Sequence, residues 1–576
     1  MVEKRWKLQQ LPESAEDLQA TQSLIEKLSI SPVLANILWQ RGVHDFDEAK
    51  TFFRPQLSHL HDPFLMKDMD RAVERLEQAI SLNQKIMVYG DYDVDGTTAV
   101  ALVYGFLSGF YEHLTYYNPD RYTEGYGVSV KGIDQAAEMG VSLIICLDCG
   151  IKAADKVQYA REKYGIDFII CDHHEPGEDL PEAVAVLDPK RKDCEYPFKE
   201  LTGNGVGFKL LTAYCLRNDI PFEKLCEYLD LAMVSIASDI VPIVGENRTL
   251  AYFGLKKMNE NPRQSLKALK QVAGHQGEMS IESVVFVIGP RINAAGRIKH
   301  AKAAVELLLS DDFDEALAFA YKIQENNTER KGLDAKITDE ALGMIRGDEW
   351  MLNQARSTVL FNENWHKGVI GIVASRCIEH FYRPTIIFTK TTGDYAAGSA
   401  RSVVGFNLYE AIEECSHLLE QFGGHMHAAG MTIPIENIQA FRLAFDTAVN
   451  NRMGAEPLIP EINIDLEIGI SDIDRKFYRI LKQMSPFGPK NMQPVFVSRN
   501  LRLASTPRIL KEKHLKIDVL DTGTGAVLSA IGFGMVDDFY KGLAAGRPFD
   551  MVYSIDENTF RGQTSLQLFI RDIKFA

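Results

Sequence analysis

The sequence predicts an α/β chain of several domains, with a mainly parallel sheet in its first half and a small β-barrel at its end. The chain has 576 residues, which is too long for one hydrophobic core. Between about residues 80 and 190, apolar runs of strand length alternate with helical patterns, as in parallel sheets covered by helices. The last part of the chain instead shows about five short strands with alternating hydrophobicity, which is typical of a small barrel.

In chain order, these patterns divide the sequence into an N-terminal helical segment, the parallel-sheet domain, a long helix, a smaller α/β domain and the barrel. The expected boundaries are 1–75, 76–310, 311–350, 351–455 and 456–576. The long helix is predicted from Phe313 to Ile345, with Asp312 and Glu315 forming a capping box at its start. Its length would be about 50 Å, enough to bridge two domains across a cleft. The prolines between Glu456 and Glu461 mark the start of the barrel.

Composition excludes some functions. Apolar runs stay below the roughly 18 residues of a membrane span, and the N-terminus has no apolar signal-peptide region, so a cytoplasmic protein without a membrane partner is expected. The net charge of −16 argues against a protein that coats nucleic acid nonspecifically, although a local basic groove remains compatible with it. Cys146 and Cys149 form a single Cys-x-x-Cys, interpreted as buried free thiols rather than as a zinc or redox site.

Three aspartates, Asp91, Asp93 and Asp95, alternate in "IMVYGDYDVDGTTA" between an apolar strand and a helical pattern. Carboxylates spaced by two crowd on one side of an extended chain unless a cation or proton intervenes. A calcium loop would need a glutamate at its twelfth position, where the chain has Leu102. The triplet is therefore predicted to lie at the carboxyl end of a strand, where open α/β sheets bind ligands.

Further acidic and imidazole side chains follow other predicted elements of this domain. They are Asp148 in "LDCG", Asp172, His173 and His174 in "CDHHEP", and Asp239 in "SDIVPI". Taken singly, each residue is ordinary as a cap or a structural hydrogen-bonding group. Together they predict a centre for Mn²⁺ or Mg²⁺, and their number suits two ions about 3.5–4 Å apart, an arrangement that favours hydrolysis at phosphorus.

The motifs "GDYDVDG", "LDCG", "CDHHEP" and "SDIVPI" resemble the four motifs of the DHH phosphoesterase superfamily, and "GGHMHAAG" resembles the Gly-Gly-His motif of the DHH-associated domain. Three further stretches, "PDRYTEGYG", "GPRINAAGR" and "WHKGVIGIVASR", resemble the RecJ family of bacterial single-strand-specific exonucleases. The resemblance extends from about residue 70 to the end. It implies a DHH catalytic domain, a bridging helix, a DHH-associated domain and an oligonucleotide-binding (OB) barrel.

The resemblance also implies a reaction. It is the hydrolysis of single-stranded DNA from the 5′ end to 5′ mononucleotides, with two Mn²⁺ or Mg²⁺ ions, in DNA repair and recombination. The expected partners are single-stranded DNA, a single-strand-binding protein and a helicase, and the chain is expected to be a monomer. Polarity and the preference for DNA rest on the resemblance alone.

Residue roles follow from the same resemblance. Asp93 would bind the first ion, with Asp91 as a further ligand, and Asp148 would bridge the two ions. Asp95, His173 and Asp239 would complete the second site. His174 would face the scissile phosphate, and Asp172 would support the histidines. The catalytic residues would be His174, Asp148 and Asp95. Tyr89 stands where several members carry a histidine ligand, so the ligand set of the first ion stays open.

The DNA contacts implied by the resemblance involve phosphate-binding side chains and glycines. They are Arg121, Arg291, Arg297, Ser399, Arg401, Gly423, Gly424 and His425. Guanidinium groups suit a terminal phosphate, and glycines let the backbone approach one closely. In the barrel, "RNLRLASTPRILKEKHLK" sets six basic residues against one glutamate and predicts a groove for a single strand.

Two alternative functions remain open from the sequence. One is a DHH phosphodiesterase acting on short oligonucleotides or cyclic dinucleotides, although such relatives are typically shorter and need neither the barrel nor the long helix. The other is a noncatalytic DNA-binding relative, against which the complete set of expected metal ligands argues.

Overall fold

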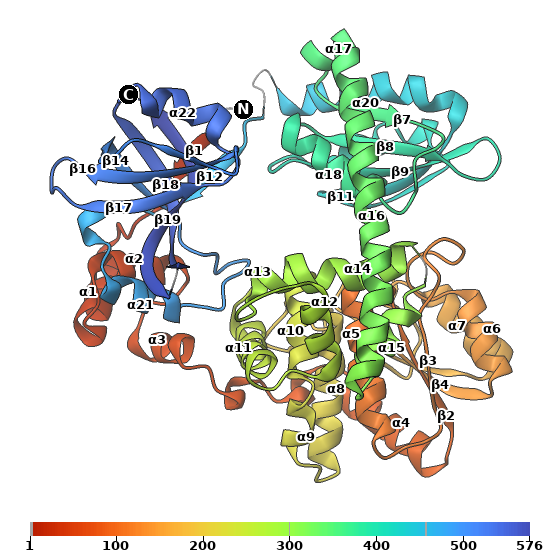
Figure 1. The fold of residues 1–576 in the computed structure, drawn as a ribbon. Helices are drawn as coiled ribbons and strands as arrows, with labels where there is room; N and C mark the ends of the chain where they lie inside the picture. The colour runs from red at the N-terminus through yellow and green to blue at the C-terminus, as the bar shows by residue number, and fades with distance from the viewer. Residues whose placement is uncertain (1–3, 299, 455–457, 561, 576) are drawn as a thin grey trace. The chain divides into compact units, whose positions relative to one another are not determined.

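The computed structural model describes residues 4–298, 300–454, 458–560 and 562–575 (Figure 1). The chain forms two compact units. The larger unit comprises Leu8–Gln324 and Ile464–Ala576, and the smaller unit comprises Met1–Lys7 and Glu325–Asn463. The start of the expected boundary at Glu456–Glu461 lies outside the described residues, which resume at residue 458.

A five-stranded parallel sheet forms the centre of the larger unit, in the order β3-β2-β4-β5-β6. Its strands are β2 (Lys85–Gly90), β3 (Leu114–Tyr117), β4 (Val141–Leu147), β5 (Asp167–Cys171) and β6 (Ala185–Leu187). Successive side chains of a strand alternate between its two faces. In β4, Ile145 and Leu147 pack into one hydrophobic cluster, whereas Ile144 and Cys146 pack into another. The parallel sheet predicted from the sequence is confirmed.

Helices cover both faces of this sheet. On one face α6 (Val130–Glu138) and α7 (Ala154–Tyr164) share a cluster with Cys146 and Cys149. The other face carries the larger cluster, which includes the mostly buried helices α5 and α8. The helices of this region outside α6 and α7 are α4 (Met69–Ser81), α5 (Val94–Ser108), α8 (Gly203–Arg217), α9 (Phe222–Cys226), α10 (Leu229–Ser238), α11 (Gly245–Glu260), α12 (Gln264–Val272), α13 (Ile281–Ser283), α14 (Gly289–Ile298) and α15 (Lys302–Leu309).

The chain passes from the larger unit to the smaller within α16 (Phe313–Gly347), which confirms the predicted long helix. Its first turn is capped as expected, because the Asp312 carboxylate accepts the Glu315 N–H at 2.9 Å. The reciprocal half of the capping box differs from the expectation. The Glu315 carboxylate accepts the Ser310 hydroxyl at 2.7 Å, which ties the cap to the preceding loop.

The smaller unit contains a mixed sheet in the order β10-β11-β9-β8-β7, in which β7 and β8 run parallel and the other neighbours antiparallel. Its strands are β7 (Thr358–Phe361), β8 (Thr385–Lys390), β9 (Tyr395–Arg401), β10 (Gln421–His425) and β11 (Ala428–Pro434). Its helices are α17 (Glu349–Asn353), α18 (Ile370–His380), α19 (Leu408–Glu413) and α20 (Ile438–Met453). Arg376 of α18 holds the buried Asp334 carboxylate of α16 at 2.9 Å and fixes that helix to the smaller unit.

The last part of the larger unit is the predicted barrel. Its sheet runs β13-β14-β18-β19-β17-β16-β15, and an extra pairing of β14 with β16 closes five of these strands into a ring. The strands are β13 (Leu466–Glu467), β14 (Phe496–Leu503), β15 (Arg508–Leu510), β16 (His514–Asp521), β17 (Val527–Gly532), β18 (Phe549–Phe560) and β19 (Gln563–Phe575), with helices α21 (Arg475–Gln483) and α22 (Val536–Ala544).

The N-terminal helices α1 (Ala15–Leu28), α2 (Pro32–Gln40) and α3 (Phe46–Phe53) share a hydrophobic cluster with the barrel. Leu34 and Leu38 of α2 are buried in it, and Arg41 pairs with Asp465 at 2.7 Å. The chain before α1 contains a strand that the helical prediction did not include. This strand, β1 (Arg5–Leu8), pairs with β12 (Glu461–Ile464), a partner that local sequence does not reveal.

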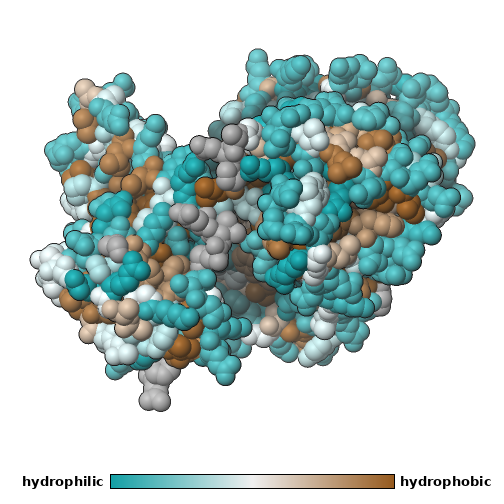
Figure 2. Space-filling view, turned by 90° about the horizontal axis from the view of Figure 1, so that it is seen from above, coloured by the Kyte–Doolittle hydropathy of each residue, from teal (hydrophilic) through white to brown (hydrophobic). Residues whose placement is uncertain are grey.

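The face shown in Figure 2 is mainly hydrophilic, with hydrophobic side chains in separate patches. Among the residues that the structure describes, none of the helices combines the length and the apolar character that a membrane crossing requires.

Candidate metal centre

The expected site residues lie where strands and a helix of the larger unit end. Asp91 directly follows β2, Asp148 follows β4, Asp172 follows β5, and Asp239 caps the C-terminus of α10. Parallel strands deliver their carboxyl ends to one edge of the sheet, so residues that are far apart in sequence meet there.

The first turn of α5 positions the next two carboxylates. Asp93 is the N-cap, and its side chain accepts the Gly96 N–H at 3.1 Å. Asp95 is buried and accepts the N–H groups of Gly203 at 2.7 Å and Asn204 at 2.9 Å, which begin α8. The Ser235 hydroxyl donates to the same carboxylate at 2.7 Å. Asp95 is therefore fixed by a helix N-terminus that stabilises its negative charge.

His173 lies among three carboxylates. Its Nε2 atom is 3.2 Å from Asp148 Oδ1, 3.6 Å from Asp95 Oδ2 and 3.7 Å from Asp239 Oδ2. This nitrogen is buried and has no hydrogen-bond partner among the described residues. Burial lowers the pKa of His173, which the charge of Asp95 only partly opposes. A neutral imidazole with a free nitrogen facing carboxylates is suited to bind a metal ion.

The surrounding carboxylates repel one another. Burial raises the pKa of Asp148 well above its usual range, and the charges of Asp95 and Asp93 add to this effect. The pKa of Asp239 is raised by burial and by the same two neighbours. Burial and the charge of Asp93 also raise the pKa of Asp91. Divalent cations would relieve this repulsion, and oxygen ligands with imidazole suit Mn²⁺ or Mg²⁺. The donor set therefore fits such ions.

Asp172 has a different environment from the other carboxylates. Burial opposes its ionisation, but the hydrogen bond and charge of His174, together with the Ile151 N–H at 2.9 Å, lower its pKa to about 2. Burial likewise opposes the charge on His174, yet the hydrogen bond to Asp172 at 2.8 Å raises its pKa to about 9. Asp172 thus supports a positively charged His174, whose side chain is 43% exposed.

The backbone around Asp148 is tightly constrained. Asp148 adopts a left-handed conformation, with a φ of 58°, which is uncommon outside glycine. Its N–H donates to the Cys171 carbonyl at 2.9 Å. Gly203 packs directly against it, because a Cβ atom at position 203 would lie 2.5 Å from the Asp148 Cβ. Such strain at a non-glycine residue is a common feature of functional sites.

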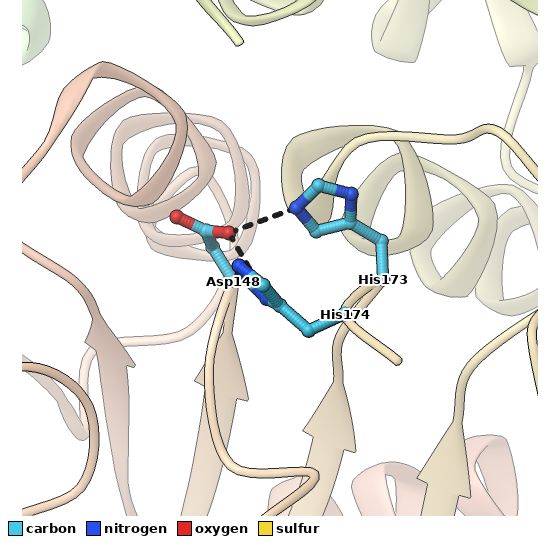
Figure 3. A group of neighbouring side chains, drawn as sticks. All are labelled: Asp148, His173 and His174. Carbon is cyan, nitrogen blue, oxygen red and sulfur yellow. Dashed lines mark ion pairs between the residues drawn. The ribbon is translucent and has the colours of Figure 1, made fainter. Parts of the chain in front are cut away.

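Two groups of side chains bring their ligand atoms within 4.8 Å of one another. One comprises Asp148, His173 and His174, which point toward one another in Figure 3, and the other comprises Asp95, His173 and Asp239. Asp91 and Asp93 belong to neither group. The Asp91 Oδ1 atom accepts the Gly127 N–H at 3.2 Å, whereas its buried Oδ2 atom has no partner among the described residues.

Tyr126 is a further residue of the site that was not among the predicted ones. Its hydroxyl donates to the Asp148 carbonyl at 2.9 Å and lies 3.2 Å from His174 Nε2. The stretch "PDRYTEGYG" was a signal for it, although the prediction took only Arg121 from that stretch. The role of Gly203 and Asn204 in holding Asp95 was also missed, since it depends on a contact between α5 and α8.

The expected DNA-binding arginines of the larger unit have differing environments. Arg121 lies over the Tyr92 ring at 4.9 Å. Arg291 is buried, donates to the Val287 carbonyl at 2.6 Å, and has its pKa lowered by burial. Arg297 lies in the last turn of α14.

In the smaller unit the expected residues lie on two strands of one sheet, β9 and β10. Ser399 and Arg401 are on β9, and the Arg401 guanidinium donates to the Ser399 hydroxyl at 3.1 Å. Strand β11 separates them from Gly423, Gly424 and His425 on β10, with Gly430 pairing to both Ser399 and Gly423. Gly424 has a φ of 150°, and a Cβ there would lie 2.4 Å from the Ala428 carbonyl oxygen. Only glycine fits this close approach.

Three family models match the chain in order. The N-terminal domain of the DHH family matches residues 85–236, the DHHA1 domain matches residues 354–451, and the RecJ OB domain matches residues 464–572. Among solved structures, that of RecJ from Thermus thermophilus in complex with Mn²⁺ superposes with a TM-score of 0.84 at 27% identity, covering 99% of this chain and 79% of that chain. The Mg²⁺ complex of the same protein gives a TM-score of 0.78 at 25% identity, covering 99% and 78%.

Curated relatives match over nearly the whole chain. The single-stranded-DNA-specific exonuclease RecJ of Bacillus subtilis is 38% identical over 571 residues, which cover 99% of this chain and 70% of the relative. The RecJ exonuclease of Escherichia coli is 32% identical over 565 residues, covering 94% and 96%. Sequence, domain order and fold agree, and the chain belongs to the RecJ family of single-stranded-DNA-specific exonucleases.

Proposed function

We propose that the chain degrades single-stranded DNA from its 5′ end to 5′ mononucleotides and uses two divalent ions, Mn²⁺ or Mg²⁺, to do so. The observation that carries this proposal is the His173 Nε2 atom, which is buried without a hydrogen-bond partner among the described residues and faces Asp95, Asp148 and Asp239. The relatives named as single-stranded-DNA-specific exonucleases, and the related structures with Mn²⁺ and Mg²⁺, support the substrate and the metals.

In this proposal Asp95, His173 and Asp239 hold one ion, and Asp93 holds the other together with Asp91. Asp148 would bridge the two, because its carboxylate is central to the cluster: the charges of Asp91, Asp93, Asp95 and Asp239 all raise its pKa. The bound ions would polarise the phosphoryl oxygens and activate the attacking water.

His174 would act on the substrate. Asp172 holds its ring and keeps it positively charged at neutral pH, while leaving it partly exposed. A charged imidazole at this position would donate a hydrogen bond to an oxygen of the scissile phosphate and stabilise the charge that develops during hydrolysis. The Tyr126 hydroxyl would hold the His174 ring and the Asp148 backbone in fixed positions relative to each other.

The smaller unit would hold the terminal 5′ phosphate. Ser399, Arg401 and His425 provide donors, and Gly423, where an added Cβ would meet nothing within 4 Å, would allow a close backbone approach. Arg121, Arg291 and Arg297 of the larger unit would contact the DNA backbone. The barrel would bind the rest of the strand through its basic stretch, although Arg499 pairs there with Glu467 and Asp550 at 2.8 and 2.9 Å. Arg499 would therefore add little to the groove.

A degradation assay with labelled oligonucleotides tests the proposal. A single strand with a 5′ phosphate and a 5′ label should release labelled mononucleotide first, whereas a 3′ label should be released last, and EDTA should stop both reactions. Early release of the 3′ label would contradict the polarity, and intact substrate with Mn²⁺ present would contradict the activity. Faster hydrolysis of a cyclic dinucleotide under the same conditions would favour the small-substrate alternative.

A further inference from the structure

Two cysteines lie in contact beside the candidate metal centre. Cys146 is the penultimate residue of β4, and Cys149 lies just beyond that strand. Their Sγ atoms are 3.3 Å apart. Both side chains are buried in the cluster that contains α6 and α7. Asp148 lies between them in the sequence and belongs to the candidate metal centre. The sequence indicated two free thiols but not that they touch.

We infer that Cys146 and Cys149 form an oxidation site, at which a disulfide lowers the affinity of the neighbouring centre for divalent ions. The inference rests on the metal centre of the proposed function and adds a chemical control to it. The oxidant considered is a peroxide, because a small molecule reaches a buried pair more readily than a bulky disulfide does.

The chemistry has two steps. The Cys149 sulfur attacks one peroxide oxygen, the O–O bond breaks, and a sulfenic acid and one water result after proton transfer. The Cys146 sulfur then displaces the sulfenic oxygen, which leaves as a second water, and the S–S bond forms. Two thiols are thus oxidised by two electrons while hydrogen peroxide is reduced to two molecules of water.

Disulfide formation would change the position of Asp148. A disulfide requires the sulfur atoms to approach to about 2.05 Å, closer than their present 3.3 Å. The intervening backbone cannot absorb this movement freely, because the Asp148 N–H and carbonyl are both hydrogen-bonded and Gly203 packs against its Cα and Cβ. Movement of the peptide would displace a carboxylate that lies 3.2 Å from His173 Nε2.

Burial sets the rate of the reaction. Neither cysteine is more than 1% exposed, so an oxidant reaches the pair slowly. Gly127 is a near neighbour of Cys149, because a Cβ at position 127 would lie 3.9 Å from the Cys149 Cβ. Slow oxidation by a small peroxide is therefore expected, rather than fast exchange with a bulky disulfide.

Cys171 offers a matched control. It is equally buried and directly precedes Asp172, as Cys149 directly follows Asp148. Its side chain packs on the other face of the sheet, in the cluster that contains α5 and α8. It can form a sulfenic acid but lies on the wrong face to form a disulfide with the pair.

The test treats the full-length, metal-free protein with millimolar hydrogen peroxide, removes the peroxide, and measures peptide masses and Mn²⁺ binding by calorimetry. The peptide with both cysteines should lose about 2 Da, Mn²⁺ affinity should fall about tenfold, and dithiothreitol should restore both. Cys146→Ala should abolish the response, and Cys171→Ala should keep it. Cys149→Ala serves as a second variant if Cys146→Ala does not fold.

Three outcomes would overturn the inference. They are peroxide treatment that oxidises exposed methionines but leaves both thiols free, a disulfide that leaves Mn²⁺ affinity unchanged, and a loss of affinity that persists in Cys146→Ala. The mass and Mn²⁺ measurements need no DNA substrate. Failure of the reduced wild-type protein to degrade single-stranded DNA would therefore count against the proposed function and not against the cysteine pair.

Discussion

The candidate metal centre of the larger unit and the proposed phosphate-binding residues of the smaller unit contain side chains of opposite charge. The first collects buried carboxylates whose pKa values are raised by burial and by one another. The second places an arginine and a serine on β9 and a histidine on β10, two strands that are separated by β11. One arrangement is unfavourable until cations bind, and the other suits an anion.

The two regions also differ in how they are assembled. The metal centre needs strand ends, a helix start and a helix end from residues 91 to 239, brought together only by the complete fold. The proposed phosphate-binding residues need only the register of β9, β10 and β11. Local sequence therefore describes the second region better, whereas the first depends on long-range packing.

The largest expected effect comes from Asp148→Asn. The amide keeps the shape of the side chain but removes the negative charge, so hydrolysis of single-stranded DNA in Mn²⁺ should fall about 10³-fold or more, which corresponds to ~4 kcal/mol. DNA binding, measured by fluorescence anisotropy, should remain. A variant that keeps a tenth of the wild-type rate would contradict the bridging role.

Arg401→Ala tests the opposite region. Loss of the guanidinium should reduce the preference for 5′-phosphorylated over 5′-hydroxyl substrate about tenfold, with little change on the 5′-hydroxyl strand. The comparison is the ratio of kcat/KM on the two substrates. Arg452→Ala is the matched control, because Arg452 lies in the same unit and pairs with Glu410 and Glu414. Equal losses on both substrates would make Arg401 a general backbone contact.

Asp148→Asn should also stabilise the metal-free protein. The pKa of Asp148 is raised in the folded protein, so the ionised carboxylate is disfavoured there at neutral pH. The contribution of Asp148 to folding stability is fully present below its unfolded-state pKa and is lost as the pH rises through its folded-state pKa. The amide should raise the unfolding temperature in EDTA by roughly 2 °C.

Asp193→Asn is the comparison variant, because the pKa of Asp193 is shifted in the opposite direction: Arg191 holds it below its usual value. This change should lower the unfolding temperature or leave it unchanged. An increase in both variants would show that crowding of carboxylates is not the cause.

The smallest expected effect comes from Tyr126→Phe. Loss of the hydroxyl removes one hydrogen bond to the Asp148 carbonyl and the contact with His174, so kcat should fall about three- to tenfold with KM unchanged. Tyr164→Phe is the control, since the Tyr164 hydroxyl binds the surface residue Asp134. A change in KM alone would instead assign Tyr126 to DNA binding.

The sequence was sufficient to predict the parts of the molecule that follow from local patterns of hydrophobicity. Strand-length apolar runs located the parallel sheet, and the position of Asp91, Asp148 and Asp172 after strands indicated the edge where they meet. Sequence could not reveal that Gly203 and Asn204 hold Asp95, because the contact joins residues more than 100 positions apart. The family resemblance already set Asp172 apart as a support for the histidines, but its low pKa could not be predicted, because it comes from hydrogen bonds of the folded chain.

The contact of helices α1 to α3 with the barrel has a consequence for synthesis of the chain. Leu34 and Leu38 leave the ribosome early, yet they pack with residues such as Leu466 and Phe477, and Arg41 pairs with Asp465, which is 424 residues later. At typical translation rates the wait is about 20 to 90 s. The apolar face of these helices therefore cannot pack against the barrel until the rest of the chain has been made.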